Sequence, residues 1–263
     1  MDSLQALWRR RDLVRTLAAS DFKSRYRRLG LGLVWAVVTP LVQGLLIAAV
    51  FSILNREQLA GPFPYALYVL TGIMPWQFFT SAMLGGSVAL LDAGQIVQRV
   101  RLPRAALPTA AVITHLYNLA FMLGVLALIV AAFAAERMGQ LYLLPAAIVL
   151  LILLPYGIAL TFATLQVRYR DVEPFLHAVV MAWFWVTPII YPFFFEPLQA
   201  HPLVVNLIRA NPMTGVVGLF RSAFLELPVD TWATVSSVVW TVFFLVVGWR
   251  VFTRREATVA DYL

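Results

Sequence analysis

Long apolar blocks separated by short charged links dominate the pattern of this chain. The blocks cover about 31–54, 65–91, 106–134, 141–167, 175–192 and 231–252. A bilayer core about 30 Å thick is crossed by about 20 helical residues. The pattern therefore predicts an all-α membrane protein with six transmembrane helices.

The region between the last two blocks, 193–230, is also apolar but is interrupted by four prolines, Pro197, Pro202, Pro212 and Pro228. Its two unbroken pieces, of about 10 and 15 residues, are shorter than a membrane span requires. Non-helical turns at membrane depth are tolerated where protein covers them. We therefore expect two short re-entrant helices on the extracytoplasmic side, between spans five and six.

The amino-acid composition also indicates that much of the chain is surrounded by lipid. The chain is 61% apolar and 13% charged, whereas soluble domains are about 45–50% apolar and ~25% charged. We expect one domain over residues 1–263, with a cytoplasmic segment at 1–30, the bundle at 31–252 and a cytoplasmic tail at 253–263. The first thirty residues are basic and lack an apolar signal-peptide core, so the first span is expected to direct the chain to the membrane.

Basic residues predict the orientation. With the N-terminus in the cytoplasm, sixteen of the arginines and lysines in the links and tails lie inside and four lie outside. The positive-inside rule then places both termini in the cytoplasm. This asymmetry accounts for most of the net charge of +7, so no nucleic-acid partner is expected.

The N-terminal segment has the pattern of an amphipathic helix. Apolar side chains recur at helical spacing, with basic and acidic residues between them and Arg11 interrupting the stripe: Leu4, Leu7, Trp8, Val14, Leu17, Ala18 and Phe22. Such a helix lies in the membrane interface with its basic side toward anionic headgroups. It serves either as an anchor or as a surface that also contacts a soluble partner.

Two inner links are rich in charge. In "RYRDVEP" (168–174), Asp171 suits an N-cap, while Glu173 and Pro174 suit the first turn of the next helix. The link "DAGQIVQRVRLPRAALP" (92–108) has room for one short helix at 94–101. Capping and positive-inside charge explain many of these residues, but the mixture of signs also suits docking of a soluble protein.

Several activities lack the residues that they need. The chain has no G-x-x-x-x-G-K-[ST] sequence, and Lys23 is its only lysine, so ATP is not expected to bind here by that route and energy must come from elsewhere. It has no cysteine, and its three histidines, His115, His177 and His201, are scattered, so no metal site is expected.

The spans also lack the acidic residues that proton- or sodium-driven transporters use, and His115 is interpreted as a core histidine. A glycan-processing enzyme would need paired carboxylates, which we do not find. The pattern favours a permease driven by a separate motor.

Six motifs occur in an order that resembles a known family. They are "SDFKSRYRRLGLGLVWAVVTPL" (20–41), "LTGIMPWQFFTSAM" (70–83), "VQRVRLPRAALP" (97–108), "RYRDVEPF" (168–175), "WVTPIIYP" (185–192) and "NPMTGVVGLFR" (211–221). Together they resemble the membrane permease of the ABC-2 family, which exports lipid-linked polysaccharides such as O-antigen, capsule and teichoic acid. The alternatives are an ABC-2 exporter of a small lipid or drug, and a membrane-embedded glycan-processing enzyme.

The resemblance implies a homodimer in the bacterial inner membrane, bound to two copies of a separate ATPase that holds ATP and magnesium. Two cytoplasmic coupling helices, at about 94–101 and 168–174, would transmit the motion of the ATPase. The residues expected to make this contact are Gln95, Gln98, Arg99, Arg101, Arg168, Arg170, Asp171 and Glu173.

The same resemblance implies a path for the glycan. Aromatic rings near span ends are ordinarily an interfacial belt, but rings can also stack against sugars. The pathway candidates are Trp35, Trp76, Phe184, Trp185, Arg209 and Arg221. An arginine at membrane depth needs a partner, for which we consider Glu196, Glu226, Asp230 or helix C-terminal carbonyls. Arg221 is expected to face the pathway. Pro40 and Pro188 are expected to loosen the first and fifth spans.

Overall fold

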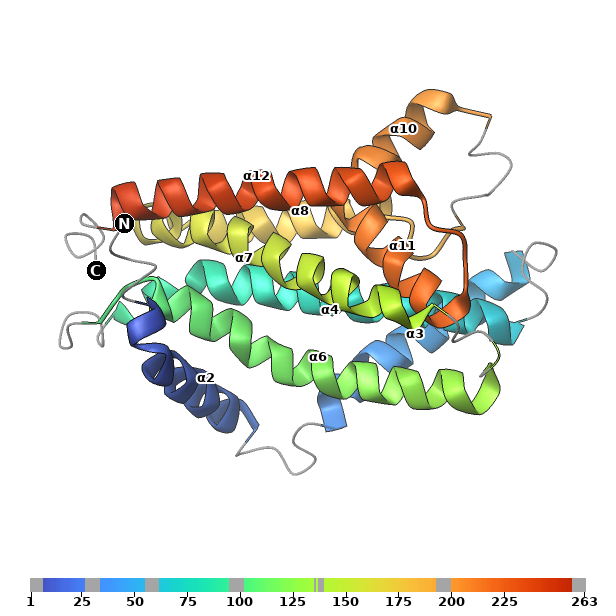
Figure 1. The fold of residues 1–263 in the computed structure, drawn as a ribbon, viewed down its shortest axis with the longest axis horizontal. Coiled ribbons are helices and arrows are strands. Elements are labelled where there is room, and N and C mark those ends of the chain that lie inside the picture. The colour runs from blue at the N-terminus through green and yellow to red at the C-terminus, as the bar shows by residue number, and fades with distance from the viewer. Residues whose placement is uncertain are drawn as a thin grey trace.

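The computed structural model describes residues 7–26, 34–54, 62–94, 102–134, 136, 140–192 and 200–256, and within these ranges the only regular elements are helices. Figure 1 shows an elongated bundle in which the start of α2 and the end of α12 lie at the same end. The helices are α2 (Arg11–Tyr26), α3 (Val34–Leu54), α4 (Pro62–Asp92), α6 (Ala106–Phe133), the 3-10 turn η2 (Leu141–Leu143), α7 (Leu144–Arg168), α8 (Val172–Val186), α10 (Pro202–Ala210), α11 (Pro212–Leu225) and α12 (Thr231–Arg255).

Three helical stretches among the described residues are long and apolar enough to cross a membrane: α6, η2 with α7, and α12. The pair α10 and α11 makes a fourth if it is counted as one broken span, since the two helices meet at 82°. Shorter apolar helical runs cover Val38–Phe51 and Val172–Val186. The two short helices predicted within 193–230 are therefore present, as α10 and α11.

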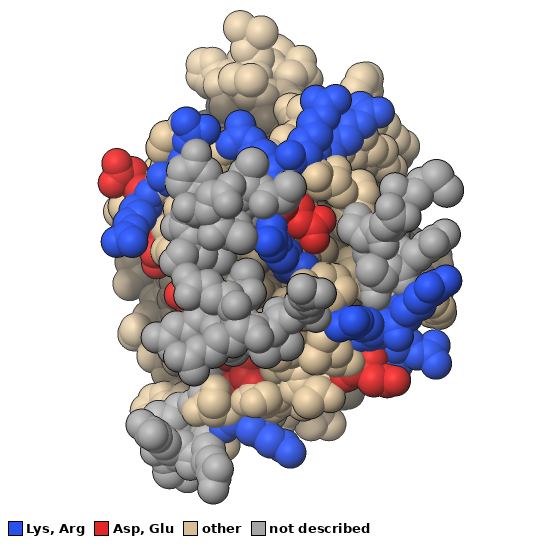
Figure 2. Space-filling view, turned by 90° about the vertical axis from the view of Figure 1, so that its left-hand side faces the viewer, with Lys and Arg blue, Asp and Glu red and all other residues tan. Residues whose placement is uncertain are grey.

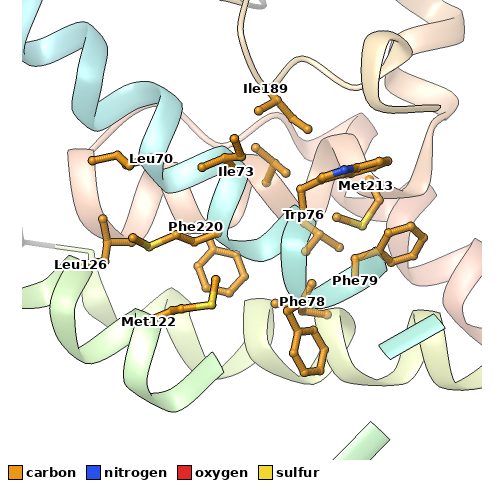
Figure 3. Packing of buried hydrophobic residues seen from close by; sticks show 14 of the residues in the cluster. Leu70, Ile73, Trp76, Phe78, Phe79, Met122, Leu126, Ile189, Met213 and Phe220 are labelled. Carbon is orange, nitrogen blue, oxygen red and sulfur yellow. The ribbon is translucent and has the colours of Figure 1, made fainter. Parts of the chain in front are cut away.

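α4 forms the centre of the bundle and packs against α3, α6, α7 and α11. Its residues from Tyr65 to Trp76 are all buried, because helices surround it on several sides. Figure 3 shows the resulting core, in which Ile73 of α4 lies toward Phe220 of α11 and Met122 of α6, while Phe79 of α4 lies beside Trp76 and Met213. This packing holds α11 inside the bundle.

α7 and α12 pack closely over a pair of glycines. A Cβ atom built on Gly248 would collide with the carbonyl oxygen of Gly157, and one built on Gly157 would lie 2.6 Å from the backbone nitrogen of Leu245. Small residues at such crossings let helix backbones approach one another in membrane proteins. The crossing fixes α12 beside α7.

α8 is shorter than its sequence predicts. The predicted span 175–192 corresponds to a helix that ends at Val186, after which Thr187 is extended, with φ −86° and ψ 130°. The physical reason is Pro188, which disfavours the helical conformation in the residue before it. The chain from Thr187 then passes beside α4, where the Tyr65 hydroxyl donates to the Ile190 carbonyl at 2.8 Å. Pro40, by contrast, lies inside a continuous α3.

α2 turns its apolar stripe toward the bundle. Val14 and Ala18 are buried, and the hydroxyl of Thr114 in α6 donates to the Ala18 carbonyl at 3.2 Å. The rings of Phe22 and Tyr117 lie 4.9 Å apart. The predicted helix is confirmed from Arg11 to Tyr26, and the apolar side chains of its stripe pack on α6. Trp8 is exposed instead, and Leu4 lies outside the described residues.

Candidate functional site

One end of the bundle gathers basic side chains. Figure 2 views this end and shows lysines and arginines along much of its rim, with fewer acidic residues among them. The exposed basic residues come from α2 and the residues before it, from the link between α7 and α8, and from the end of α12: Arg9, Arg10, Arg11, Arg15, Lys23, Arg168, Arg170, Arg250, Arg254 and Arg255. Segments far apart in sequence thus form one charged surface.

The link between α7 and α8 is a tight turn on this surface. Arg168, Arg170, Asp171 and Glu173 are all exposed. Asp171 occupies the N-cap position of α8, as expected, but its side chain makes no capping hydrogen bond. Its carboxylate is therefore not engaged at the helix end. Gln166, with 1% of its surface exposed, supports the turn from below through a long 3.4 Å hydrogen bond to the Arg170 carbonyl.

The second predicted coupling segment falls outside the described residues. Gln95, Gln98, Arg99 and Arg101 all belong to 95–101, on which the structure gives no information. Their assignment stays a prediction. α4 leads into this segment at Asp92 and α6 follows it at Ala106, and both helix ends lie toward the charged end in Figure 1.

The four aromatic candidates occupy different environments. Trp76 is only 4% exposed and belongs to a buried cluster, with its ring 5.4 Å from Phe79 and 5.7 Å from Phe184. Trp35 and Trp185 are 49% and 59% exposed. Trp185 stacks edge-on against Phe184 at 5.6 Å, so one aromatic network runs from the core near Trp76 to the surface at Trp185.

Trp35 also borders a small polar cavity of about 190 Å³ between α3, α4 and α6. Gln77, Ser81, His115 and Asn118 contribute polar groups to its lining. His115 is buried there, in agreement with its interpretation as a core histidine.

The bend between α10 and α11 is built around Asn211. Its side-chain oxygen accepts from the Met213 backbone at 3.0 Å and from the indole nitrogen of Trp183 at 2.8 Å. Its side-chain nitrogen donates to the Thr187 hydroxyl at 2.9 Å. The predicted helix start at Asn211 is thus confirmed, and the same side chain ties the bend to the end of α8. We call α10, the bend and α11 together the cap.

The two arginines of the cap have different partners. Arg209 in α10 is partly exposed, and its Nε donates to the carboxylate of Asp230 at 2.9 Å. Asp230 also caps α12 by accepting from the Ala233 backbone at 2.9 Å. Of the partners considered from the sequence, Arg209 thus has Asp230.

Arg221 in α11 is 5% exposed and surrounded by the chain. Its guanidinium donates to the carbonyls of Pro188 at 2.6 Å and Ile189 at 2.8 Å, and more weakly to that of Tyr68 at 3.4 Å. The Tyr68 ring lies 3.5 Å from the guanidinium carbon. The partners are thus backbone carbonyls of α4 and of the segment after α8, and they are neither the acidic residues nor the helix C-terminal carbonyls considered from the sequence.

This geometry changes the interpretation of Arg221. The sequence suggested a guanidinium that faces a substrate path, whereas the structure uses it to join α11, α4 and the extended segment after α8. The sequence analysis did not single out Asn211, Trp183 and Thr187 as a set. The available signal was an asparagine in an apolar stretch, since a polar side chain at membrane depth needs partners.

Comparisons with known proteins agree with this architecture. Residues 12–225 match the family described as "ABC-2 type transporter". The O-antigen export system permease protein RfbA of Myxococcus xanthus is 28% identical over 225 residues, which is 85% of this chain and 84% of that protein. A Klebsiella pneumoniae protein of the same name is 25% identical and covers 96% of this chain and 95% of its own length.

The polysialic acid transport protein KpsM of Escherichia coli is 24% identical over 251 residues, covering 92% of this chain and 93% of that protein. The family match covers most of the chain, including the charged turn, the aromatic network and the cap. The chain belongs to the ABC-2 type transporter family.

Proposed function

We propose that this chain is the membrane-embedded permease subunit of an ATP-driven exporter that moves a lipid-linked polysaccharide from the cytoplasmic side across a bacterial inner membrane. The observation that carries the proposal is end-to-end similarity to proteins named as O-antigen export permeases, over 96% of this chain and 95% of the relative in one case. This similarity favours a polysaccharide over a small lipid or drug, and a transport subunit over a glycan-processing enzyme.

In the proposed topology the charged end faces the cytoplasm. Both termini lie there, six segments cross the bilayer, and α10 and α11 form a re-entrant cap on the opposite side. The gathering of exposed arginines and lysines at one end supports this orientation, since cytoplasmic links hold an excess of basic residues. The cap is at the other end of the bundle, where Asp230 neutralises Arg209.

The energy would come from two copies of a separate ATPase, which would hold ATP and magnesium. The link at 168–174 suits this contact because Arg170, Asp171 and Glu173 are exposed and the turn is short. We propose the segment 95–101 as the second contact. α8 begins at this turn and ends at the cap, so one helix of 15 residues joins the motor surface to the cap.

The glycan would pass between two copies of the chain, along α3 and α8. Trp35 and Trp185 are the candidates that a sugar ring would meet, because about half of each side chain is exposed. Phe184 and the buried Trp76 would support Trp185 from behind through the aromatic network. Arg209 and Arg221 would act by holding the cap in place.

Reconstitution tests the proposal. The chain and its ATPase are purified together, placed in lipid vesicles with a lipid-linked polysaccharide, and supplied with ATP and magnesium. We expect polysaccharide to become accessible to a glycosidase on the side opposite the ATPase, and only when ATP is hydrolysed. ATP-driven movement of a fluorescent phospholipid with no movement of polysaccharide would instead favour a small-lipid exporter.

A further inference from the structure

A cavity of about 630 Å³ lies between α11, the start of α12 and the segment that joins them. It belongs neither to the charged turn nor to the aromatic network. Arg209, Arg221 and Asp230 contribute charge to its lining. Leu227 and Trp232 contribute apolar surface, and Gly218 contributes a wall without a side chain.

Gly218 gives the first indication that this space takes a ligand. Glycine inside a helix costs about 1 kcal/mol relative to alanine, so packing usually explains its presence. Gly215, one turn earlier, has such a reason, because a Cβ atom there would collide with Ala233 and Ser237 of α12. A Cβ atom on Gly218 would meet nothing within 4 Å. Neighbouring residues therefore do not require a glycine at 218, and its effect is to enlarge the cavity.

The charge of the lining gives a second, independent indication. Arg209 and Arg221 both line the cavity, and Asp230 is the acidic residue among the lining residues. Two positive groups thus face one carboxylate, and the lining keeps a net positive charge that favours an anionic group.

The distribution of polarity indicates the kind of ligand. Arg209, Arg221 and the first turn of α12 supply positive charge and backbone N–H groups in excess of the single Asp230 carboxylate, a combination that suits a phosphate. Much of the remaining lining is apolar, and Leu203, Leu207, Trp232, Val235 and Val239 expose apolar surface on α10 and α12. A polar head beside an apolar chain matches an amphiphile. A glycan segment would need more hydrogen-bonding partners than this lining provides.

We propose that this cavity binds a phospholipid, with its phosphate at Arg209 and the start of α12 and an acyl chain over Gly218. The bound lipid fills the space beside α11, which Tyr68 and Arg221 also line, and thereby supports the cap. This site lies beyond the proposed export function, because the lipid stays bound and is not transported.

Filling the cavity tests the proposal. Gly218→Leu places a side chain where the acyl chain would lie. Gly124→Leu is the matched control, because Gly124 is an exposed glycine of α6 whose Cβ would also meet nothing within 4 Å. The full chain with its ATPase is purified, stripped of lipid, mixed with phosphatidylglycerol and examined by native mass spectrometry. We expect Gly218→Leu to lower the occupancy of the tightest lipid site roughly tenfold, a loss of about 1.4 kcal/mol, and Gly124→Leu to leave it unchanged.

Equal phosphatidylglycerol occupancy in the two leucine variants would overturn the proposal. Binding of a soluble oligosaccharide that is lost in Gly218→Leu, without a change in lipid binding, would also overturn it and make the cavity a glycan site. If Gly218→Leu melts at a much lower temperature than Gly124→Leu, Val229→Trp is used in its place, because it narrows the exposed side of the cavity. Phosphatidylglycerol occupancy and oligosaccharide binding are then measured as before and interpreted in the same way.

The charged side has its own test. Arg209→Met with Asp230→Asn removes both charges, while the asparagine still caps α12. We expect this double variant to lose its preference for phosphatidylglycerol over diacylglycerol, which has no phosphate. A wild-type chain that binds the two lipids equally would contradict the placement of the phosphate.

Discussion

The arginines at the two ends of the bundle serve opposite purposes. At the charged end, Arg168 and Arg170 are exposed on a tight turn. In the cap, Arg221 is buried and bonded to carbonyls of the same chain, and Arg209 is paired with Asp230. One end thus presents its charge at the surface, whereas the other neutralises its charge internally. The role of an arginine near a membrane span thus depends on its bonding partners as well as on its position in the sequence.

The largest effect on folding is expected at Arg221. Arg221→Met keeps the length of the side chain but leaves the Pro188 and Ile189 carbonyls without their donor. Breaking such a buried polar cluster costs about 3–5 kcal/mol. We expect a steep loss of folded protein, measured as the melting temperature and yield in detergent. Arg221→Lys restores only part of it, because lysine lacks the planar fork. Normal stability with abolished export would return Arg221 to the substrate path.

A smaller effect is expected at Asn211, which links the cap to α8. Asn211→Ala removes the N-cap of α11 and the partner of Trp183, for a loss of about 2–3 kcal/mol. The indole of Trp183 then loses its hydrogen-bond acceptor, so its fluorescence maximum should shift toward that of a hydrated ring. The measurement is made in a background variant in which the other seven of the eight tryptophans are replaced by phenylalanine, so that the fluorescence comes from Trp183 alone. A melting temperature equal to that of the background would show that the bend does not depend on this side chain.

A still smaller effect is expected at Arg209. The pair with Asp230 is partly exposed, and exposed ion pairs contribute about 0.2–1 kcal/mol. Arg209→Gln should therefore lower the melting temperature far less than Arg221→Met when both are measured in the same detergent. If the two variants were equally unstable, the contrast between an exposed and a buried arginine would be lost.

The smallest effect on folding is expected at the charged turn, where the effect on export is large. Asp171→Lys with Glu173→Lys reverses two exposed charges, and Asp171 makes no capping bond to lose. We expect normal yield and melting temperature, with ATP hydrolysis no longer coupled to export. Asp171→Glu with Glu173→Asp is the control that keeps both charges. Normal export by the double lysine variant would remove this turn from the coupling surface.

The sequence predicted the positions of α6, α7 and α12 well, because length and hydropathy are enough to identify long apolar helices. It placed the end of α8 too late, although Pro188 was a visible signal, because the apolar run continues past the proline. It could not predict which carbonyls Arg221 would reach, since Tyr68 and Pro188 are 153 and 33 residues away from it in sequence. Contacts of that kind depend on the packing of three elements, which a local pattern does not encode.

The same limit applies to the aromatic candidates. Trp35 and Trp76 have similar local sequences, each within an apolar stretch near a proline. The structure separates them, because α4 lies in the middle of the bundle and buries Trp76, while α3 lies at its surface and leaves Trp35 half exposed. The position of a helix within the bundle, more than its own residues, decides whether a ring can meet a substrate.

The most direct test of polysaccharide export is made in cells that lack this chain and retain its ATPase. We expect the lipid-linked polysaccharide to accumulate on the cytoplasmic face and to disappear from the cell surface. The wild-type chain should restore it, and the Asp171→Lys, Glu173→Lys variant should not, although it is present in the membrane at a normal level. Unchanged surface polysaccharide, with no lipid-linked pool inside the cell, would contradict the account.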